Sequence, residues 1–241
     1  MKEERFFYTP DIDTSDLLPD EEMAHAIRVL RLGVGDKIWL MNGKGTFYEA
    51  EIMEITKKFC KFKIISSFLQ KKTWRPYIHI AVAPTKNIDR IEWFVEKAVE
   101  IGVDEISIIN TDFTERKNIN LNRLDKIAIS AMKQSRKPFK TIINNLQDFN
   151  SFVKNVAQNN RFICHCYEQN NNNELKNKIL LKNCVNEIDD AVVIIGPEGD
   201  FSIREVLDAQ KNKFIPVSLG DSRLRTETAA LVALHIVNLL S

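Results

Sequence analysis

The sequence predicts an α/β protein in which a small β-rich part precedes a larger, doubly wound part. Up to Trp74-Arg75-Pro76 the pattern is one of short strands and turns, and after it apolar strands alternate with helical periods. Two glycine-containing loops near the C-terminus each follow an apolar strand, where an open α/β sheet usually holds its ligand. We therefore divide the chain into residues 1–72 and 73–241.

In the β-rich part, strands are expected over residues 37–41, 46–55 and 59–65. The dipeptide Asn42-Gly43 between the first two strands is the strongest short-range signal of a hairpin. The third strand alternates apolar with basic side chains. A small antiparallel sheet or barrel follows from this pattern.

In the larger part, strands are expected over residues 77–83, 106–110, 141–143 and 162–166, and in the segments at Ala191 and Phe214. Helices are expected from about Asn87 to a stop at Gly102, around 124–135, over 149–157 and over 228–240. The last helix is apolar nearly all round, so it requires burial on more than one side. A polar run at residues 169–173 reads as a turn.

Charge gives no global argument for nucleic acid, because 34 basic residues nearly balance 33 acidic ones. The basic residues are nevertheless concentrated in two stretches without acids, residues 57–75 and 126–147. These stretches would give the protein one basic face that suits RNA. An ordinary solvated strand and helix surface explains them equally well.

The four cysteines are too few and too scattered for a disulfide framework, which favours a reducing cytoplasm. Cys164-His165-Cys166 suggests a metal site, but successive residues of one strand point to opposite faces, so we expect no metal. The N-terminus lacks the apolar core of a secretory signal. The longest apolar stretch, residues 229–240, is shorter than the roughly 20 residues that span a bilayer, so we expect no membrane segment.

The first C-terminal loop is Gly196-Pro-Glu-Gly199, in which glycines permit positive φ and close approach of a ligand, and Pro197 stiffens the turn. Ser202 and Glu205 form a predicted capping box, so the loop leads into a helix whose N-terminus can face an anion. A plain strand-to-helix connection is the alternative. The loop after residue 83 lacks the Gly-x-Gly-x-x-Gly of a dinucleotide site, which argues against a Rossmann cofactor site.

The second loop turns at Gly220, and Thr226 is placed to cap the last helix, with Glu227 in its first turn. Arg223 and Arg225 precede the cap. Either arginine would pair with Glu227 or Glu198, or else supply a fixed positive charge beside an electron-rich base or a phosphate.

Together these loops resemble the paired signature of the ribosomal RNA small subunit methyltransferase E family, in the SPOUT class of S-adenosylmethionine enzymes. The signature consists of residues 196–199 with Phe201-Ser202, and of 218–220 with 224–229. The likeness covers nearly the whole chain and continues through Arg5-Phe6-Phe7, 25–31, Lys86, 90–104, Glu115-Arg116 and Gln134-Ser135. Two departures are visible: Asp200 stands where the family usually has a glycine, and Arg136 follows Ser135 without the glycine common there.

The resemblance implies a C-terminal domain with a trefoil knot, a PUA-like N-terminal barrel, and a homodimer with sites near the subunit interface. Chain-connection rules alone weigh against a knot. The resemblance also implies that S-adenosylmethionine is held mainly by main-chain groups of three loops. In this sequence the corresponding residues are Thr85, Gly196, Pro197, Glu198, Gly199, Leu219, Gly220, Leu224, Arg225 and Thr226.

The implied reaction is methyl transfer to N3 of a uridine in 16S ribosomal RNA, free or in the small ribosomal subunit. The enzyme must align donor and acceptor and favour deprotonated N3. We expect Arg225 to stabilise charge on the base and Glu198 to relay the proton; Glu227 is a second choice, for which a helix-end role is preferred. The expected RNA contacts are Arg5, His25, Arg28, Arg31, Lys86 and Arg136. A methyltransferase for another ribosomal or transfer RNA site, and a non-catalytic RNA-binding assembly factor, stay as alternatives.

Overall fold

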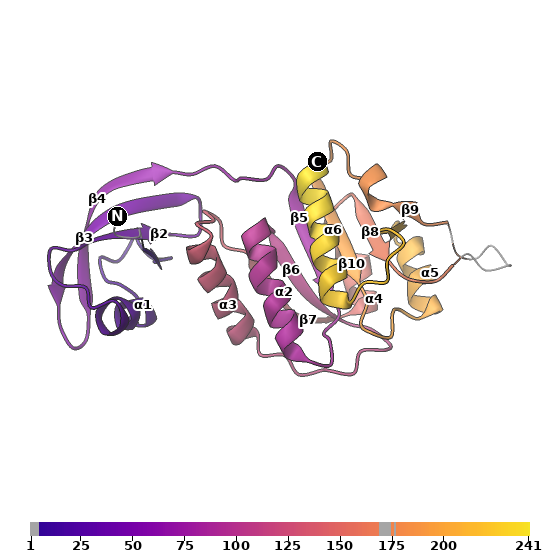
Figure 1. Ribbon diagram of the computed structural model, residues 1–241, viewed down its shortest axis with the longest axis horizontal. Coiled ribbons are helices and arrows are strands. Elements are labelled where there is room, and N and C mark those ends of the chain that lie inside the picture. The colour runs from indigo at the N-terminus through magenta and orange to yellow at the C-terminus, as the bar shows by residue number, and fades with distance from the viewer. Residues whose placement is uncertain (1–4, 169–174, 176) are drawn as a thin grey trace. The chain divides into compact units, whose positions relative to one another are not determined.

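The structure of the protein is a computed structural model that describes residues 5–168, 175 and 177–241 (Figure 1). The chain forms two compact units. The first extends up to Thr73 and includes Ile129–Lys140, and the second comprises Trp74–Ala128 and Thr141–Ser241. The polar turn expected at residues 169–173 lies outside the described residues.

Within its described residues, the first unit contains a four-stranded sheet in the order β1-β2-β3-β4. Its strands are β1 (Phe6–Tyr8), β2 (Lys37–Met41), β3 (Thr46–Ile55) and β4 (Cys60–Leu69). The predicted bounds of β2 and β3 are confirmed. The predicted antiparallel pairing of β2, β3 and β4 is confirmed, and the sequence pattern missed β1, which pairs with β2 in parallel. The sequence pattern also missed two short helical segments, α1 (Asp20–Ala24) and η1 (His25–Val29).

The predicted hairpin at Asn42-Gly43 joins β2 to β3. Asn42 Oδ1 accepts hydrogen bonds from the backbone N–H groups of Lys44, at 2.8 Å, and Thr46, at 3.1 Å. The side-chain amide thus replaces a strand partner at the turn, which is the usual role of asparagine there. Under this sheet lies an apolar core that includes Phe7, Leu40, Ile52 and Phe62.

The segment Ile129–Lys140 folds with the first unit although it lies inside the second in sequence. It contains the end of α3 (Leu121–Gln134). Its backbone bonds to the hairpin, with Gly45 N donating to Pro138 O at 2.9 Å and Lys140 N donating to Gly43 O at 2.9 Å. Chain continuity is therefore a poor guide to the composition of this unit.

The second unit confirms an α/β fold with a parallel sheet. Its described strands lie in the order β7-β6-β5-β10-β8-β11-β9, and every pair is parallel. The strands are β5 (Tyr77–Val82), β6 (Glu105–Asn110), β7 (Ile142–Asp148), β8 (Arg161–Cys164), β9 (Ile179–Leu180), β10 (Asp190–Ile195) and β11 (Ile215–Ser218). A short 3₁₀ segment, η2 (Leu181–Asn183), follows β9.

Helices cover both faces of this sheet. They are α2 (Ile88–Ile101), α4 (Phe149–Asn155), α5 (Ile203–Lys211) and α6 (Thr226–Leu240). Val192 and Ile194 of β10 belong to the core cluster under α4 and α5. Successive strand residues point to opposite faces, so Val193 and Ile195 face the side on which α6 packs. Figure 1 shows α2 and α6 side by side on that face.

The last helix buries one stripe deeply, with Ala230, Ala233, Leu234 and Val237 fully covered. Its remaining apolar side chains are partly covered, and Leu239 and Leu240 near its end are exposed. The sequence predicted that α6 is buried on more than one side. Within a single chain, one side of the helix is fully buried and the others are only partly covered. No helix among the described residues is long and apolar enough to cross a membrane.

Gly102 ends α2 as predicted, and its backbone conformation requires glycine. Its φ of 118° lies in a region that other residues rarely adopt. An added Cβ would lie 2.5 Å from Cε3 of the Trp74 ring. The indole is held in place because Trp74 Nε1 donates to Asp104 Oδ2 at 2.9 Å.

We predict that Gly102→Ala lowers the free energy of unfolding by about 2 to 4 kcal/mol, because backbone strain adds to a clash with the indole. Urea unfolding measures this loss. Gly35→Ala is the matched control: Gly35 also has a positive φ, of 90°, but an added Cβ there meets nothing within 4 Å. Its loss should be about 1 kcal/mol, from strain alone. Equal losses in the two variants would contradict the role of Trp74.

Candidate functional site

A pocket of about 850 Å³ opens at the carboxyl ends of β8, β10 and β11. Nearly all the residues predicted to bind a cofactor line it: Gly196, Pro197, Glu198, Gly199, Leu219, Gly220, Leu224, Arg225 and Thr226. Thr85 is not in this lining. It is fully buried, and its hydroxyl donates to Asn87 O at 2.6 Å, at the start of α2. The two C-terminal loops thus meet as the sequence indicates, whereas the third predicted loop contributes no side chain here.

The glycines of the first loop are needed for space and not for positive φ. An added Cβ at Gly196 would lie 3.1 Å from the carbonyl carbon of Asp200, and one at Gly199 would lie 3.1 Å from Phe113 Cβ. Neither glycine has a positive φ. The predicted positive φ occurs instead at Asp200, at 67°. Ser202 and Glu205 then form the predicted capping box at the start of α5.

Asp200 connects the loop after β10 to the loop after β8. Its Oδ2 accepts from Cys166 N at 2.7 Å, and its Oδ1 accepts from Phe201 N at 2.8 Å. The left-handed φ explains why a glycine suits this position, and the two hydrogen bonds offset the strain of the aspartate. The other departure from the family pattern, Arg136, also has a left-handed φ, of 54°.

Glu198 fixes the first loop to the chain between β5 and α2. Its Oε1 accepts from Lys86 N at 3.1 Å, and Arg90 Nη1 lies 3.8 Å from the same oxygen. Arg116 donates to Lys86 O through Nε, at 3.0 Å, and through Nη2, at 2.8 Å. The side chain of Lys86, a predicted RNA contact, forms an exposed ion pair with Glu115 at 2.9 Å, which raises the pKa of Lys86.

The prediction that Thr226 caps α6 with its side chain is wrong. Arg225 occupies the cap position, and Thr226 is the first residue of the helix. The Thr226 hydroxyl instead donates to Gly196 O at 3.0 Å in a buried hydrogen bond. This bond joins the two predicted cofactor loops directly. Glu227 lies in the first turn of α6, as predicted.

The arginines of the second loop pair with neither carboxylate. Arg223 and Arg225 are exposed and form no ion pair with a described acidic residue. Arg90 of α2 lies between the two carboxylates instead, 3.8 Å from Glu198 Oε1 and 3.9 Å from Glu227 Oε1. Both loop guanidinium groups are therefore available to a ligand.

A second pocket, of about 620 Å³, adjoins the first and shares the wall formed by Arg223, Leu224 and Arg225. Its other lining residues come from the starts of α2 and α6: Asp89, Arg90, Trp93, Glu227 and Thr228. Glu227 is only 7% exposed, and its Oε2 has no hydrogen-bond partner among the described residues.

The segment Cys164-His165-Cys166 lines the larger pocket, a position that sequence reasoning missed. Strand β8 ends at Cys164, so the argument that the three side chains alternate across a strand does not apply. Neither ring nitrogen of His165 has a partner among the described residues, although the side chain is buried. Burial and the nearby Lys178 lower the pKa of His165 to about 4. In the described part of the chain, no group of three or more acidic, histidine or cysteine residues is arranged to hold a metal ion.

The other predicted RNA contacts lie in the first unit. His25, Arg28 and Arg31 are exposed around η1, and Arg5 is exposed before β1. Arg136 stacks over the Phe6 ring, with its Cζ 5.4 Å from the ring centroid. Phe6 in turn contacts Trp39, which contacts the exposed Phe68, each pair at 5.7 Å between centroids. This aromatic row was not predicted, although its residue types are those that stack on unpaired bases.

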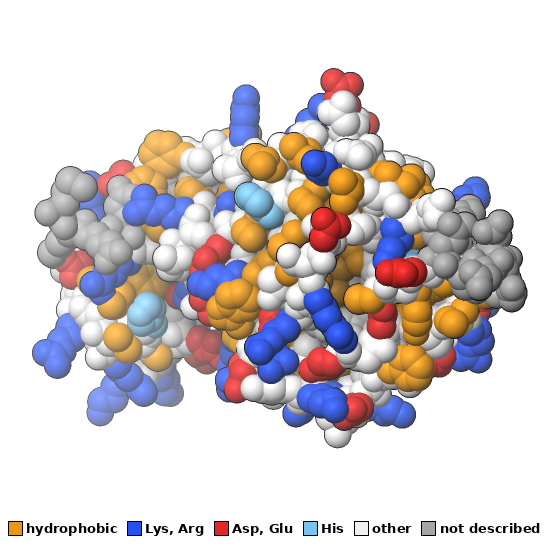
Figure 2. Space-filling view, turned by 45° about the vertical axis from the view of Figure 1, so that its right-hand side comes forward, with side chains coloured by type: hydrophobic (Ala, Val, Ile, Leu, Met, Phe, Trp, Pro, Cys, Tyr) orange, Lys and Arg blue, Asp and Glu red, His pale blue; other side chains and the backbone are white. Residues whose placement is uncertain are grey.

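The surface charge is mixed. On the face drawn in Figure 2, basic and acidic side chains are interspersed, with hydrophobic side chains between them. This distribution agrees with a net charge of +1. Recognition of a polyanion must then depend on local groups and not on the total charge.

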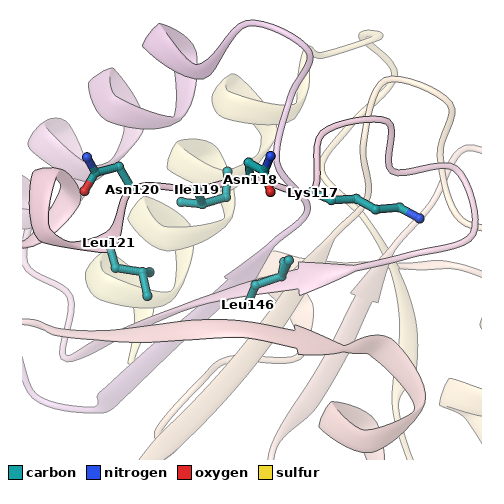
Figure 3. A pocket seen from close by; sticks show the side chains of 6 residues that line it. All are labelled: Lys117, Asn118, Ile119, Asn120, Leu121 and Leu146. Carbon is teal, nitrogen blue, oxygen red and sulfur yellow. The ribbon is translucent and has the colours of Figure 1, made fainter.

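A separate pocket of about 410 Å³ lies beside the segment 117–121 (Figure 3). Leu146 of β7 lies opposite this segment, and Lys117 is the one charged residue among the six that line the hollow. Asn120 serves locally, because its Oδ1 accepts from Arg123 N at 3.1 Å. No residue predicted to act in chemistry lines this pocket.

Comparison with known proteins agrees with this architecture. A model of the RNA methyltransferase domain matches residues 72–238, and a model of the RNA methyltransferase PUA domain matches residues 18–65. Ribosomal RNA small subunit methyltransferase E of Buchnera aphidicola subsp. Acyrthosiphon pisum (strain APS) is 30% identical to this protein. The alignment covers 95% of this chain and 90% of the relative.

Several solved structures resemble nearly the whole chain. A probable rRNA-methyltransferase from Porphyromonas gingivalis is 41% identical, with a TM-score of 0.88 over 97% of this chain and 98% of that one. A ribosomal RNA small subunit methyltransferase E from Neisseria gonorrhoeae, solved bound to S-adenosyl methionine, is 25% identical, with a TM-score of 0.81 over 96% of this chain and 95% of that one.

The fold and its loops are those of an RNA methyltransferase domain, preceded by a PUA domain of the kind found in such enzymes. The extent and identity of the matched relatives are more specific. The chain belongs to the ribosomal RNA small subunit methyltransferase E family.

We predict that His165 makes stability depend on pH. Its pKa is about 4 when folded and about 6.5 when unfolded, so the unfolded chain binds more protons between these values. The contribution of neutral His165 to the free energy of unfolding is therefore fully present above pH 6.5. It is lost as the pH falls toward 4, by about 1 to 3 kcal/mol.

Urea unfolding of the wild type and of His165→Phe at pH 7 and pH 5 measures this dependence. The variant should lose less stability on acidification. Burial also lowers the pKa of His79. Its effect on stability is the same in both proteins, so it cancels when their losses are compared. Equal losses in the two proteins would contradict the assignment.

Proposed function

We propose that the protein transfers the methyl group of S-adenosylmethionine to N3 of a uridine in 16S ribosomal RNA. The observation that carries this proposal is the 850 Å³ pocket formed by the two C-terminal loops, beside two unpaired arginines. The names of the relatives support the RNA substrate, and the bound ligand of the Neisseria gonorrhoeae structure supports the cofactor.

The residues that line the pocket fit this cofactor. Two loops with little side-chain bulk, at Gly196–Gly199 and at Leu219-Gly220, leave main-chain donors and acceptors for an adenosine. The unpartnered ring nitrogens of His165 offer one donor and one acceptor within the same pocket. When bound, the cofactor supplies an electrophilic methyl group on a sulfonium ion.

The protein's part in the reaction is to position the base and to favour its deprotonated form. We infer that Arg225, exposed in the wall between the two pockets, stabilises the negative charge that develops on the uracil. The sequence assigns the proton to Glu198 and, as second choice, to Glu227. Both carboxylates approach Arg90, so both belong to one charged group beside the loops.

We further propose that the C-terminal part forms the trefoil knot of the SPOUT class. In support, β11 lies beyond β8 in the sheet, yet α6, which follows it, packs on β5 and β10. The chain therefore returns across the end of β10, where Thr226 bonds to Gly196. The exposed Leu239 and Leu240 support the predicted homodimer, and a ribosomal substrate supports a cytoplasmic location.

We propose that residues 1–72 bind RNA through Arg5, His25, Arg28, Arg31 and the aromatic row of Phe6, Trp39 and Phe68, to which Arg136 of the same unit contributes. Lys86 is the one proposed RNA contact that lies in the second unit. It belongs to the part that the sequence division gives as residues 73–241. Exposed guanidinium groups bind phosphates, and exposed rings stack on bases.

The proposed reaction predicts N3-methyluridine after incubation with labelled S-adenosylmethionine and small subunits, or their free RNA, from cells that lack the modification. Nucleoside mass spectrometry measures the product. Arg225→Ala should lower turnover about 10²- to 10³-fold and cofactor affinity much less. Methyl transfer to another RNA, or cofactor binding without transfer to any RNA, would replace the proposal with one of its alternatives.

The proposed RNA contacts predict a change in salt dependence. In the double variant Arg28→Ala/Arg31→Ala, the slope of log affinity against log salt concentration should fall by about 1.4, because each phosphate contact to single-stranded RNA contributes about 0.7. Fluorescence titration of the RNA over a range of salt concentrations measures the slope. Arg204→Ala, which removes an exposed side chain that pairs with Asp112, serves as the control. An unchanged slope in the double variant would exclude these contacts.

A further inference from the structure

The 620 Å³ pocket beside the proposed cofactor site contains a buried carboxylate without a hydrogen-bond partner. Glu227 is 7% exposed, and no described donor reaches its Oε2. Its Oε1 lies 3.9 Å from Arg90 Nε, which is too long for a hydrogen bond. Burial of an ionised carboxylate without hydrogen bonds is unfavourable, so the position is suited to a donor that arrives with a ligand.

Glu198, in contrast, is partly exposed and already accepts a hydrogen bond. Its side chain is 32% exposed, and its Oε1 already accepts from Lys86 N. Its carboxylate therefore serves to hold the loop after β10 against the start of α2. Of the two carboxylates near Arg90, Glu227 is the one that is buried and accepts no hydrogen bond from a described donor.

The groups around Glu227 are complementary to the Watson–Crick edge of uracil. That edge presents an N–H donor between two carbonyl acceptors, so it requires an acceptor flanked by donors. Glu227 lines the pocket together with two arginines, Arg90, whose Nε lies 3.9 Å from Glu227 Oε1, and Arg223. Cytosine presents an acceptor at N3, which a carboxylate would repel. Trp93, 46% exposed on α2, adds a ring on which a base can stack.

We propose that this pocket, lined by Arg90, Trp93, Arg223 and Glu227, receives the target uracil, and that Glu227 is the group that accepts its N3 proton. The proposal rests on the function proposed above and names the acceptor side of that same site. Because this pocket and the cofactor pocket share Arg223, Leu224 and Arg225, a bound base would lie beside the cofactor.

The step balances as follows. The N3–H bond breaks and its proton passes to a Glu227 oxygen, while the N3 electron pair forms a bond to the methyl carbon. The bond from that carbon to sulfur breaks, and its electron pair stays on sulfur, which converts the sulfonium ion into a neutral sulfide. Glu227 then releases its proton to solvent when the product leaves.

Glu227→Gln tests the proposal, because it keeps the size of the side chain and removes its capacity to take a proton at neutral pH. We expect the single-turnover rate of methyl transfer to small subunits or their free RNA to fall about 10²- to 10⁴-fold. The remaining rate should rise with pH, about tenfold per unit, because only hydroxide is left to deprotonate N3. The affinity for S-adenosylhomocysteine, measured by calorimetry, should stay within about twofold of the wild type.

The matched control is Glu198→Gln, which should keep the wild-type dependence of rate on pH whatever its effect on the rate. The melting temperature of Glu227→Gln is measured as well, to check that the variant folds without the ion pair to Arg90. A wild-type pH profile in Glu227→Gln, an equal loss of cofactor affinity, or a steep profile in Glu198→Gln in its place would overturn the assignment. If the wild type itself produces no N3-methyluridine, the proposed function fails, and the role of Glu227 fails with it.

Discussion

The buried hydrogen bond from the Thr226 hydroxyl to the carbonyl of Gly196 is the interaction on which the rest of the site depends. It fixes the start of α6 to the end of β10, and the residues on either side of it then define two pockets. The residues before Thr226 form the wall that the pockets share, and Glu227, directly after it, faces only the smaller pocket. Loss of this bond would leave a buried carbonyl without its partner and release both loops together.

Two further contacts support the same junction from opposite sides. On one side, Asp200 connects the loops after β10 and β8 through Cys166 N. On the other, Glu198 connects the loop after β10 to Lys86 N. Parallel strands provide no direct connection between neighbouring carboxyl ends, so the geometry of such an edge depends on loop contacts of this kind. Side-chain carboxylates hold backbone N–H groups on these two sides of the pocket, and Arg223 and Arg225 line it without an ion pair to a described acidic residue.

Local sequence signals predicted the parts of the fold that depend on local interactions. The hairpin at Asn42-Gly43 and the helix bounded by Asn87 and Gly102 occur where they were expected, because turn and cap chemistry is decided within a few residues. The assignment of Ile129–Lys140 to the first unit was not predictable in this way. It depends on backbone bonds to a hairpin far away in sequence, and periodicity carries no information about such partners.

The same distinction holds for the site. The glycine loops mark its position in the sequence, but the residues that give it chemical character are known only from their tertiary surroundings. The sequence led us to prefer Glu198 to Glu227, and only the structure shows that a Glu198 oxygen finds a backbone donor whereas Glu227 Oε2 does not. His165 is likewise an ordinary strand-end residue until the folded chain buries it without partners.

Three unfavourable local features lie around this edge of the sheet. Asp200 has a left-handed φ, and His165 and Glu227 are buried with unsatisfied polar atoms. Each of these features costs stability, which the rest of the fold must supply. Because the unsatisfied atoms of His165 and Glu227 belong to residues that line the pockets, their hydrogen-bonding capacity is available to bound molecules.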